Sequence, residues 1–281
     1  MAARPEPTLR AQWLGQQLRR YREAAGLTLK EAAAYLNRDS STVSRFEADL
    51  YPPRDNDVQE LLTLYGVSSE PIRSSLRKLS MEVWQKGWWE GYAKDVDPSI
   101  VDYAWLEARA AEIKSFNPIV VPGLLQTPAY AEAVMRAVDP DVPDEQVDRW
   151  LEVRMLRQQT LSLPRPTQFT AILDESVLRR PVGGHRVMTE QLEHLAEVAL
   201  RPNIHIRVLP ERLGAHAAPD GSFKLFNMPE PYPNLACIET PAGVIYVEDD
   251  GIKRFVAAFD RLEQATLDRE ESIAELQKWS R

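Results

Sequence analysis

The chain has 281 residues, of which 44% are hydrophobic and 27% are charged, as in an ordinary folded protein. A chain of this length is more often two domains than one. No stretch approaches the roughly 20 apolar residues of a membrane span, and the single cysteine, Cys237, cannot build a disulfide framework. The first residues show no apolar signal core, so we expect a cytoplasmic protein with no membrane partner.

The charge is unevenly distributed along the chain. The net charge is −8, yet residues 1–80 carry 12 Lys and Arg against 10 Asp and Glu, a net charge of +2, and the other 201 residues carry 22 against 32, a net charge of −10. Residues 10–45 hold 7 basic and 3 acidic side chains. Because a local excess of basic residues is the electrostatic signature of phosphate binding, we expect any nucleic-acid contact in this segment.

The N-terminal segment predicts a series of short helices. From Leu9 the apolar residues Trp13, Leu14 and Leu18 fall at helical spacing, and Gly26 ends this first helix. Further along, two more helices close the small core of the domain. They are expected over Asp55–Tyr65 and about Glu70–Leu79, with Val58, Leu61, Leu62, Leu76 and Leu79 turned inward.

A second and a third helix follow the first closely. Thr28 and Glu31 have the spacing of a capping box at the start of an alanine-rich helix. Asn37 stands where the chain must turn, because Asn tolerates the left-handed conformation, and Asp39 is placed to cap a helix over Ser40–Ala48. Two short helices joined by a tight turn form a helix-turn-helix motif, whose second helix enters the major groove of DNA by its N-terminal end.

The third helix divides into two faces. Val43 and Phe46 point inward at helical spacing. The outward face and its N-terminal end carry Ser40, Ser41, Ser44 and Arg45. A polar helix face alone is ordinarily just solvated, but here a cap, an alanine-rich partner helix, a turn residue and a basic charge balance occur together. Since each of these is separately needed by the motif, we predict DNA binding.

The stretch "LRRYREAAGLTLKEAAAYLNRDSSTVSRFEADLYPP" resembles the helix-turn-helix of phage repressors and xenobiotic-response regulators. The resemblance extends over about residues 9–79 and implies a sequence-specific DNA-binding domain. On this basis the double-stranded DNA is expected to contact Thr28, Arg38, Ser40, Ser41, Thr42, Ser44 and Arg45. The resemblance further implies that Ser40, Ser41 and Arg45 read base edges, with Thr42 and Ser44 nearer to phosphate.

Two residues depart from the pattern of that family. Leu29 stands where the family often begins its second helix with a Gln that supports DNA contacts. Arg38 stands where an apolar or small residue is more usual, and its charge can serve as a phosphate anchor instead. The resemblance also pairs Glu47 with Arg22 as an internal ion pair, which makes Glu47 part of the scaffold rather than of the DNA-reading surface.

An aromatic-rich bridge follows the DNA-binding domain. We place the domain over residues 1–80 and the bridge over residues 81–98, where Trp84, Trp88, Trp89 and Tyr92 occur together. Such aromatic residues pack a bridge onto one of the two domains, or form a dimer contact or a ligand lid. The second domain, with an acidic balance, occupies residues 99–281.

The second domain is expected to combine helices with a small mixed sheet. Four of the expected helices cover Val101–Phe116, Asp144–Leu161, Ile252–Ala265 and Leu267–Trp279. Another begins at Pro128 with Thr127 as its cap, and a further one lies within "VGGHRVMTEQLEHLAEVALRPNIHIRVLP". The expected strands lie in "QFTAILDES", at the end of the segment just quoted, and over Ser222–Asn227, Leu235–Glu239 and Val244–Glu248. The fold class is therefore mainly α with a smaller α+β part, in which a five-helix repressor-like domain precedes a helical segment and a small mixed sheet.

The second domain offers weak signals for catalysis. The candidate groups are Asp174, Glu175, His185, His194, His205, His216 and Asp220. No two of the histidines have the short spacing of a metal site, Cys237 has no cysteine partner, and Ser176 lacks the glycine flanks of a nucleophile elbow. Gly183 and Gly184 lie near three arginines but outside any phosphate-binding fingerprint. We therefore expect no catalytic site, no metal and no cofactor.

The second domain also carries a resemblance. The runs "VVPGLLQTPAYA", "LDESVLRRPVGG", "LPERLGAHAAPDGSF" and "FDRLEQATLDREES" look like the uncharacterised C-terminal domain that accompanies this helix-turn-helix in many actinobacterial regulators. Some members of that group are described as antitoxin-like or developmental regulators, often encoded beside a small partner protein. The resemblance covers nearly the whole chain.

Three functions follow from this reading. The first is a transcriptional regulator whose second domain dimerises, senses a small molecule or binds a partner, with a homodimer expected because single modules bind weakly. The second is an antitoxin-like interaction protein that binds a small partner protein and autoregulates its own promoter. The third, an enzyme fused to a DNA-targeting domain, has the least support. The operator, the direction of regulation and the effector leave no signature in the sequence.

Overall fold

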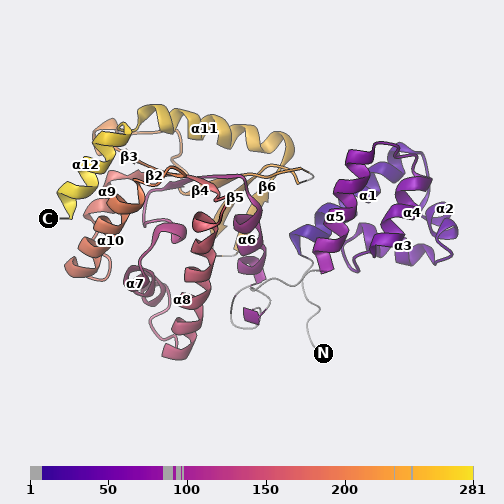
Figure 1. The fold of residues 1–281 in the computed structure, drawn as a ribbon, viewed down its shortest axis with the longest axis horizontal. Coiled ribbons are helices and arrows are strands. Elements are labelled where there is room, and N and C mark those ends of the chain that lie inside the picture. The colour runs from indigo at the N-terminus through magenta and orange to yellow at the C-terminus, as the bar shows by residue number, and fades with distance from the viewer. Residues whose placement is uncertain are drawn as a thin grey trace. The chain divides into compact units, whose positions relative to one another are not determined.

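The computed structural model describes residues 8–84, 91–92, 96, 98–230, 232–241 and 243–280. The chain divides into an N-terminal unit, Met1–Glu90 with Glu230–Tyr232, and a C-terminal unit, Gly91–Pro229 with Pro233–Arg281 (Figure 1). No helix among the described residues is long and apolar enough to cross a membrane.

The N-terminal unit has the five helices that the sequence predicts. They are α1 (Leu9–Ala24), α2 (Leu29–Tyr35), α3 (Ser40–Glu47), α4 (Asp55–Leu64) and α5 (Glu70–Trp84). The expected inward residues of α4 and α5 are all buried. The last helix runs five residues beyond the expected end at Leu79, and Trp84 donates from Nε1 to the carbonyl of Pro53 at 3.2 Å. Trp88 and Trp89 of the expected bridge lie outside the described residues.

Helices α1 to α4 all end in the same way. A residue with positive φ follows the C-cap of each helix, and the next amide donates back to a carbonyl in the last turn, at 2.9–3.1 Å. The four residues with positive φ are Gly26, Asn37, Asp49 and Gly66. This is the Schellman motif, which satisfies carbonyls that a helix end leaves without partners. Tight, hydrogen-bonded ends allow five short helices to pack in about eighty residues.

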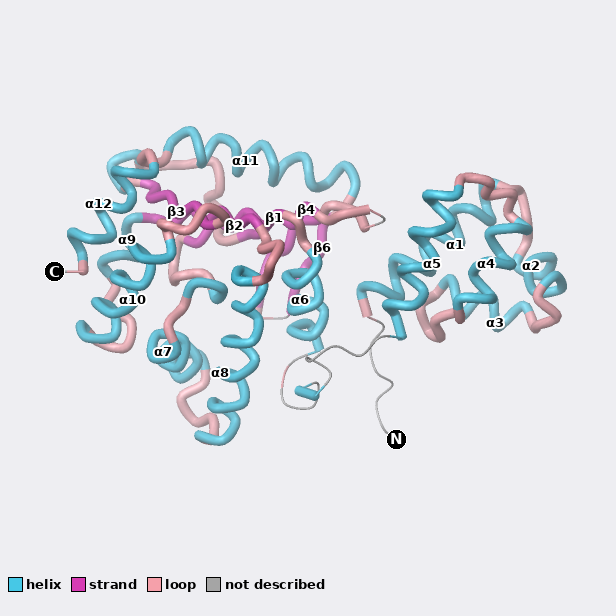
Figure 2. Tube along the Cα trace, in the orientation of Figure 1, coloured by secondary structure: helices cyan, strands magenta, loops and turns pink. Residues whose placement is uncertain are grey.

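The C-terminal unit is built on a six-stranded sheet of order β3-β2-β1-β4-β5-β6 (Figure 2). The strands are β1 (Glu112–Asn117), β2 (Gln168–Asp174), β3 (Ile204–Leu209), β4 (Phe223–Asn227), β5 (Leu235–Thr240) and β6 (Gly243–Val247). The first three are parallel, and β4, β5 and β6 pair in antiparallel fashion from β1 outward. The small mixed sheet that the sequence predicts is confirmed, with one strand more than expected.

Helices cover both faces of this sheet. They are α6 (Pro98–Arg109), α7 (Pro128–Val138), α8 (Asp144–Gln158), α9 (Glu175–Arg179), α10 (His185–Val198), α11 (Ile252–Ala265) and α12 (Arg269–Trp279). Helix α11 runs along one face, and α6, α8 and α10 lie on the other (Figure 1). The expected cap of α7 is confirmed, because the Thr127 hydroxyl accepts from the amide of Tyr130 and Pro128 opens the helix.

The expected helix over Val101–Phe116 is wrong in its second half. Helix α6 ends at Arg109, and residues 112–117 form β1, which pairs with β2 on one side and β4 on the other. The alanine-rich sequence before the strand favours a helix locally, whereas pairing along both edges supplies hydrogen bonds that no local pattern reveals. This strand lies at the centre of the sheet, so the error concerns the element around which the unit is organised.

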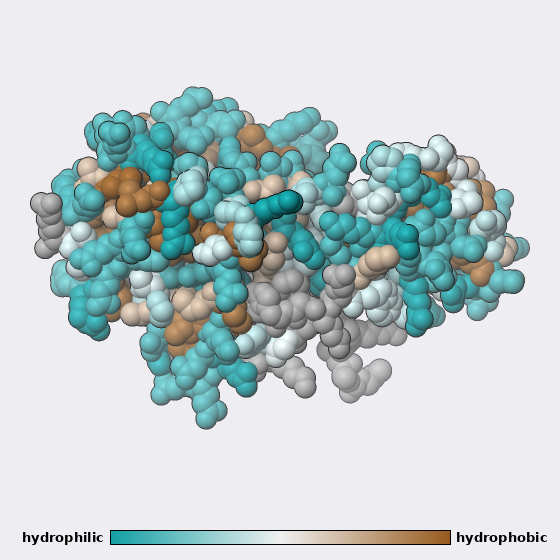
Figure 3. Space-filling model, in the orientation of Figure 1, coloured by the Kyte–Doolittle hydropathy of each residue, from teal (hydrophilic) through white to brown (hydrophobic). Residues whose placement is uncertain are grey.

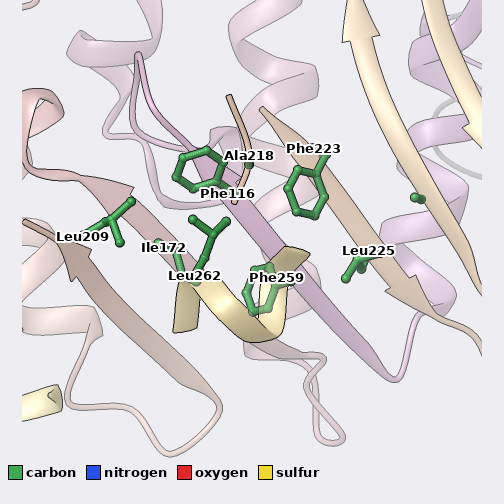
Figure 4. Packing of buried hydrophobic residues seen from close by; sticks show 9 residues of the cluster. Phe116, Ile172, Leu209, Ala218, Phe223, Leu225, Phe259 and Leu262 are labelled. Carbon is green, nitrogen blue, oxygen red and sulfur yellow. The ribbon is translucent and has the colours of Figure 1, made fainter. Parts of the chain in front are cut away.

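The core under α11 is aromatic. Phe116 of β1 and Phe223 of β4 face each other in register, and Phe259 of α11 packs against Phe223 with ring centroids 6.3 Å apart (Figure 4). The other members of this cluster are Ile172, Leu209, Ala218, Leu225, Ala236 and Leu262. Full burial of each large apolar side chain contributes about 1.5–3 kcal/mol, so α11 is held to the sheet chiefly by hydrophobic contact.

Asp49, which follows α3, has one buried carboxylate oxygen. Asp49 Oδ1 is buried and has no hydrogen-bond partner among the described residues. Burial raises the pKa of Asp49 from 3.8 to about 6. A Cβ added to Gly15 would lie 2.3 Å from this oxygen, which shows how closely α1 approaches.

We therefore expect Asp49→Asn to stabilise the N-terminal unit by about 1–3 kcal/mol at pH 8. The folded pKa lies above the unfolded one, so the destabilisation by the charged form is complete above about pH 6 and disappears below about pH 4. Asn tolerates the positive φ of this position. Thermal unfolding of both proteins at pH 4 and pH 8 checks the prediction, and an equal gain at both pH values would contradict it.

Candidate nucleic-acid interface

The start of α2 is held by the capping box that the sequence predicts. Thr28 Oγ1 accepts from the amide of Glu31 at 3.2 Å, and Glu31 Oε2 accepts from the amide of Thr28 at 2.8 Å. The Thr28 hydroxyl also donates to the same carboxylate at 2.7 Å. The hydrogen bond from the Thr28 amide lowers the pKa of Glu31, and the hydrogen bond from the Thr28 hydroxyl lowers it to a smaller extent. Thr28 is exposed, yet its hydroxyl is already used within the cap.

The turn between α2 and α3 has the expected geometry. Asn37 has a φ of 57°, and Asp39 occupies the N-cap position of α3 with extended backbone, although its carboxylate makes no capping hydrogen bond. Helix α3 ends at Glu47, one residue before the expected end at Ala48. Val43 and Phe46 are 0% and 1% exposed, so the inward face is fully buried. The orientation of α3 is therefore set by packing.

The outward face of α3 is polar and accessible. Ser40, Ser41 and Arg45 are exposed, whereas Thr42 and Ser44 are half-buried at the sides of the helix. Among the described residues, the guanidinium of Arg45 makes no hydrogen bond or ion pair, so it is available to a ligand. Ser41 and Arg45 are four residues apart and therefore share one face.

Several of the predicted residues lie around one shallow hollow in the surface. Thr28 lines it from the start of α2, and Ser40, Ser41 and Ser44 line it from α3. The remaining lining residues are Arg22, Leu29 and Lys30. The fold thus brings together four of the seven predicted DNA contacts, and it leaves Arg38, Thr42 and Arg45 outside the hollow.

Arg38 is tied to α4. Its Nη2 and Nε donate to Asp57 Oδ1 at 2.8 and 3.2 Å, while 45% of its side chain stays exposed. A phosphate would therefore have to share the guanidinium with Asp57. This contact was not predicted from the sequence, because Arg38 lies in the turn between α2 and α3, and Asp57 lies on α4, 19 residues further along the chain.

An ion pair fixes α3 to α1. Arg22 donates from Nε and Nη2 to the two oxygens of Glu47 at 2.6 and 2.8 Å, and from Nη1 to the carbonyl of Leu27 at 2.7 Å. The hydrogen bond to Glu47 raises the pKa of Arg22. The pair is nearly enclosed, with 11% and 7% of the two side chains exposed. The geometry agrees with the scaffold role implied for Glu47.

Sequence reasoning missed three residues of this unit. Gly15 allows α1 to touch the end of α3, since an added Cβ would lie 2.7 Å from the carbonyl of Phe46. Lys30 lines the hollow, and Arg54 is exposed at the N-cap of α4. The basic character of residues 10–45 included Lys30, but charge alone does not say which face a lysine occupies.

Three of the polar groups singled out in the C-terminal unit make hydrogen bonds to the backbone. Asp174 caps α9 through the amide of Ser176 at 2.9 Å, and Glu175 accepts from the amide of Glu211 at 3.0 Å. His216 Nδ1 accepts from the amide of Ala218 at 3.2 Å. No group of three or more potential metal ligands occurs within the described part of the chain.

The glycine pair before α10 is explained by packing. Gly183 has a φ of 70°, and an added Cβ would lie 2.9 Å from Val187 Cγ1. The nearby Arg186 is paired with Glu190 at 2.7 Å, and Arg179 is paired with Glu211. Two of the three neighbouring arginines are thus already neutralised, which weakens the idea of an anion cradle here.

Comparison with known proteins defines the class of each unit. Residues 13–74 match a helix-turn-helix domain family, so the N-terminal unit is a helix-turn-helix domain. Residues 100–278 match a domain of unknown function, DUF5753, and the chain belongs to that family.

One curated protein is similar to part of this chain. The HTH-type transcriptional regulator ImmR of Bacillus subtilis (strain 168) is 39% identical over 57 residues, which are 20% of this chain and 45% of that protein. The similarity thus spans less than half of the length of that relative. No solved structure matches the chain.

The Arg22–Glu47 pair can be tested by removing its cation. Arg22→Ala leaves the enclosed Glu47 carboxylate without its partner, so we expect a loss of about 3–5 kcal/mol in the stability of the N-terminal unit. Arg19→Ala is the matched control, because Arg19 pairs with Glu23 at 2.8 Å on the surface, and such pairs contribute about 0.3–0.5 kcal/mol. Chemical denaturation followed by circular dichroism measures both, and similar losses would contradict the scaffold role.

Proposed function

We propose that this protein is a transcriptional regulator that recognises a specific DNA sequence through α3. One observation carries the proposal: the buried Val43 and Phe46 orient α3 so that Ser41 and the unpaired Arg45 form an accessible polar face. Arginine binds guanine through two hydrogen bonds in the major groove, whereas serine accepts several bases. Arg45 therefore supplies most of the discrimination between sequences.

The hollow beside α3 supports contacts to the DNA backbone. Ser44 and Lys30 line it, and their hydroxyl and ammonium groups are suited to phosphate oxygens. Thr42, at the side of α3, is the remaining candidate on that helix. Thr28 contributes through its place at the start of α2 rather than through a free hydroxyl, because the capping box already uses that group.

The similar Bacillus protein is a transcriptional regulator, which supports the same function for this chain. We further propose that the chain acts as a homodimer on a nearly palindromic site. Two helix-turn-helix units read half-sites about 34–36 Å apart, which makes up for the weak binding of one unit. An alternative, from the resemblance of the C-terminal domain, is binding of a small partner protein.

Selection of bound fragments from genomic DNA, with the full chain at two salt concentrations, tests the proposed function. We expect one short inverted repeat to be enriched. Arg45→Ala should lose about 1–3 kcal/mol of affinity for that repeat and bind unrelated sequences as before. Arg45→Lys keeps the charge without the planar fork, so it should also lose sequence preference while keeping the salt dependence. Full enrichment of the repeat by Arg45→Ala would show that α3 does not read DNA through this residue.

A phosphate contact should behave differently from a base contact. We expect Arg38→Ala to weaken binding to all sequences alike and to lower the slope of log affinity against log salt by about 1. Arg77→Ala is the matched control, because Arg77 forms the same kind of pair with Asp55, at 3.1 Å, on the α5 side of the unit. Equal salt slopes for wild type and Arg38→Ala would remove Arg38 from the interface.

A further inference from the structure

The C-terminal unit contains a pocket of about 610 Å³. Its floor is the sheet face opposite α11, with Asn117 of β1, Lys224 of β4 and Cys237 of β5. Tyr103 of α6 and Arg154 of α8 line its walls, together with hydrophobic residues of α7 and of the loop after β1. This volume lies within the range of roughly 300–1,000 Å³ that is usual for pockets that bind small molecules.

The pocket lies at a place in the sheet where ligands commonly bind. The chain moves outward from β1 to β2 and β3, and then returns to the other side of β1 as β4. The order of strands therefore reverses at β1, and the pocket is lined by Asn117 at the carboxyl end of that strand and by the loop that follows it. Crevices at such reversal points, outside the carboxyl ends of parallel strands, are the general binding sites of open α/β sheets.

Two ion pairs neutralise most of the charge around the pocket. Arg157 donates to both oxygens of the buried Glu107 at 2.7 and 2.9 Å. Lys224 Nζ lies 2.8 Å from Glu239 Oε1, and the attraction of this ammonium lowers the pKa of Glu239 to about 2. Both cations also face the ring of Tyr103, at 5.2 Å for the Arg157 guanidinium carbon and 4.6 Å for Lys224 Nζ.

Arg154 carries a positive charge that neither of these pairs neutralises. Among the described residues it has no carboxylate within ion-pair distance, and its Nη1 donates a hydrogen bond to the neutral Gln126 Oε1 at 2.5 Å. Its Nε is buried without an acceptor in the same described set. The pKa of Arg154 is lowered to about 10, chiefly by burial and to a smaller extent by repulsion from Arg157. The guanidinium therefore stays charged at neutral pH, and a negative charge beside it would stabilise it.

We propose that this pocket binds a small organic carboxylate with an apolar body, and that Arg154 is the residue that recognises the carboxylate. The lining suits both parts of such a molecule. Guanidinium and carboxylate match in geometry and can form two parallel hydrogen bonds. Val134 on α7, with Ile100 and Val121, offers apolar contact to the rest of the ligand.

Figure 3 shows the hydropathy of one face of the molecule. Hydrophilic residues cover most of the visible face, and hydrophobic residues appear as separate patches. Isolated patches of this kind are normal on monomeric proteins and need no partner to explain them. The pocket, in contrast, combines a mostly apolar lining with an arginine that has no carboxylate partner among the described residues.

Calorimetric titration of the full chain with three acids and their primary amides tests the proposal. The probes are 1-naphthaleneacetate, 4-phenylbutyrate and octanoate, each beside the amide of the same shape. In wild type we expect at least one acid to bind roughly tenfold tighter than its amide, or more, because a hydrogen-bonded charge pair forms only with the acid. In Arg154→Gln the affinity for that acid should fall to the affinity for its amide. In Arg154→Lys the affinity for the acid should lie between those of wild type and Arg154→Gln.

Two further variants separate the pocket from general effects on the fold. Val134→Trp fills the apolar part, so it should weaken the acid and its amide alike. Arg136 of α7 pairs with Glu132 and Asp144 at 2.9 and 2.8 Å and does not line the pocket. The control variant Arg136→Gln should therefore bind the acid and its amide like wild type. Equal affinities within all three acid and amide pairs, absence of binding by all six probes at millimolar concentration, or undiminished acid binding by Arg154→Gln would overturn the proposal.

Ligand binding in this experiment does not depend on the proposed function. The titrations contain no DNA, so they can succeed even where sequence-specific DNA binding fails, and the reverse also holds. Repeating the DNA titration with the acid that binds best would then show whether the occupied pocket changes the affinity for DNA. A change of that affinity, absent in Arg154→Gln, would make the carboxylate an effector of the regulator.

Discussion

The ion pair between Arg22 and Glu47 is the interaction on which the geometry of the N-terminal unit depends. It joins the end of α1 to the end of α3, and the same guanidinium also holds the carbonyl of Leu27 in the turn before α2. Three elements are thereby tied at one point. An enclosed, bidentate pair fixes both the distance and the angle between the two helices, and it adds this constraint to the packing of Val43 and Phe46.

A buried arginine–glutamate pair of the same kind occurs in the C-terminal unit. The Arg157–Glu107 pair is buried and bidentate like Arg22–Glu47, but a second arginine, one turn earlier on α8, has no carboxylate partner in the part of the chain that the structure describes. Burying an unpaired charge is expensive, and proteins rarely retain one without a partner. The contrast between Arg157 and Arg154 on a single helix is what makes Arg154 stand out as a ligand-recognising group rather than as part of the scaffold.

Much of the N-terminal unit follows from local sequence signals. Thr28 with Glu31, Asn37, and the pair Val43 and Phe46 each specify a feature whose physical cause lies within a few residues, and the structure has all of them. Contacts such as Arg38 with Asp57 and the approach of α1 at Gly15 escape this kind of reasoning. They depend on how segments distant in the sequence pack together, and that packing is set by the whole core rather than by any one segment.

The C-terminal unit shows what a single misread strand conceals. Strand β1 lies in the middle of the sheet, and its sequence continues the helical pattern of α6 until pairing on both edges overrides it. Without β1 there is no reversal in the strand order, and Asn117, the loop after it and Arg154 have no common location. An arginine on a helix of alternating charge is ordinarily a solvent-facing residue. Only the sheet turns Arg154 into the wall of a pocket, so the missed strand and the missed site have one cause.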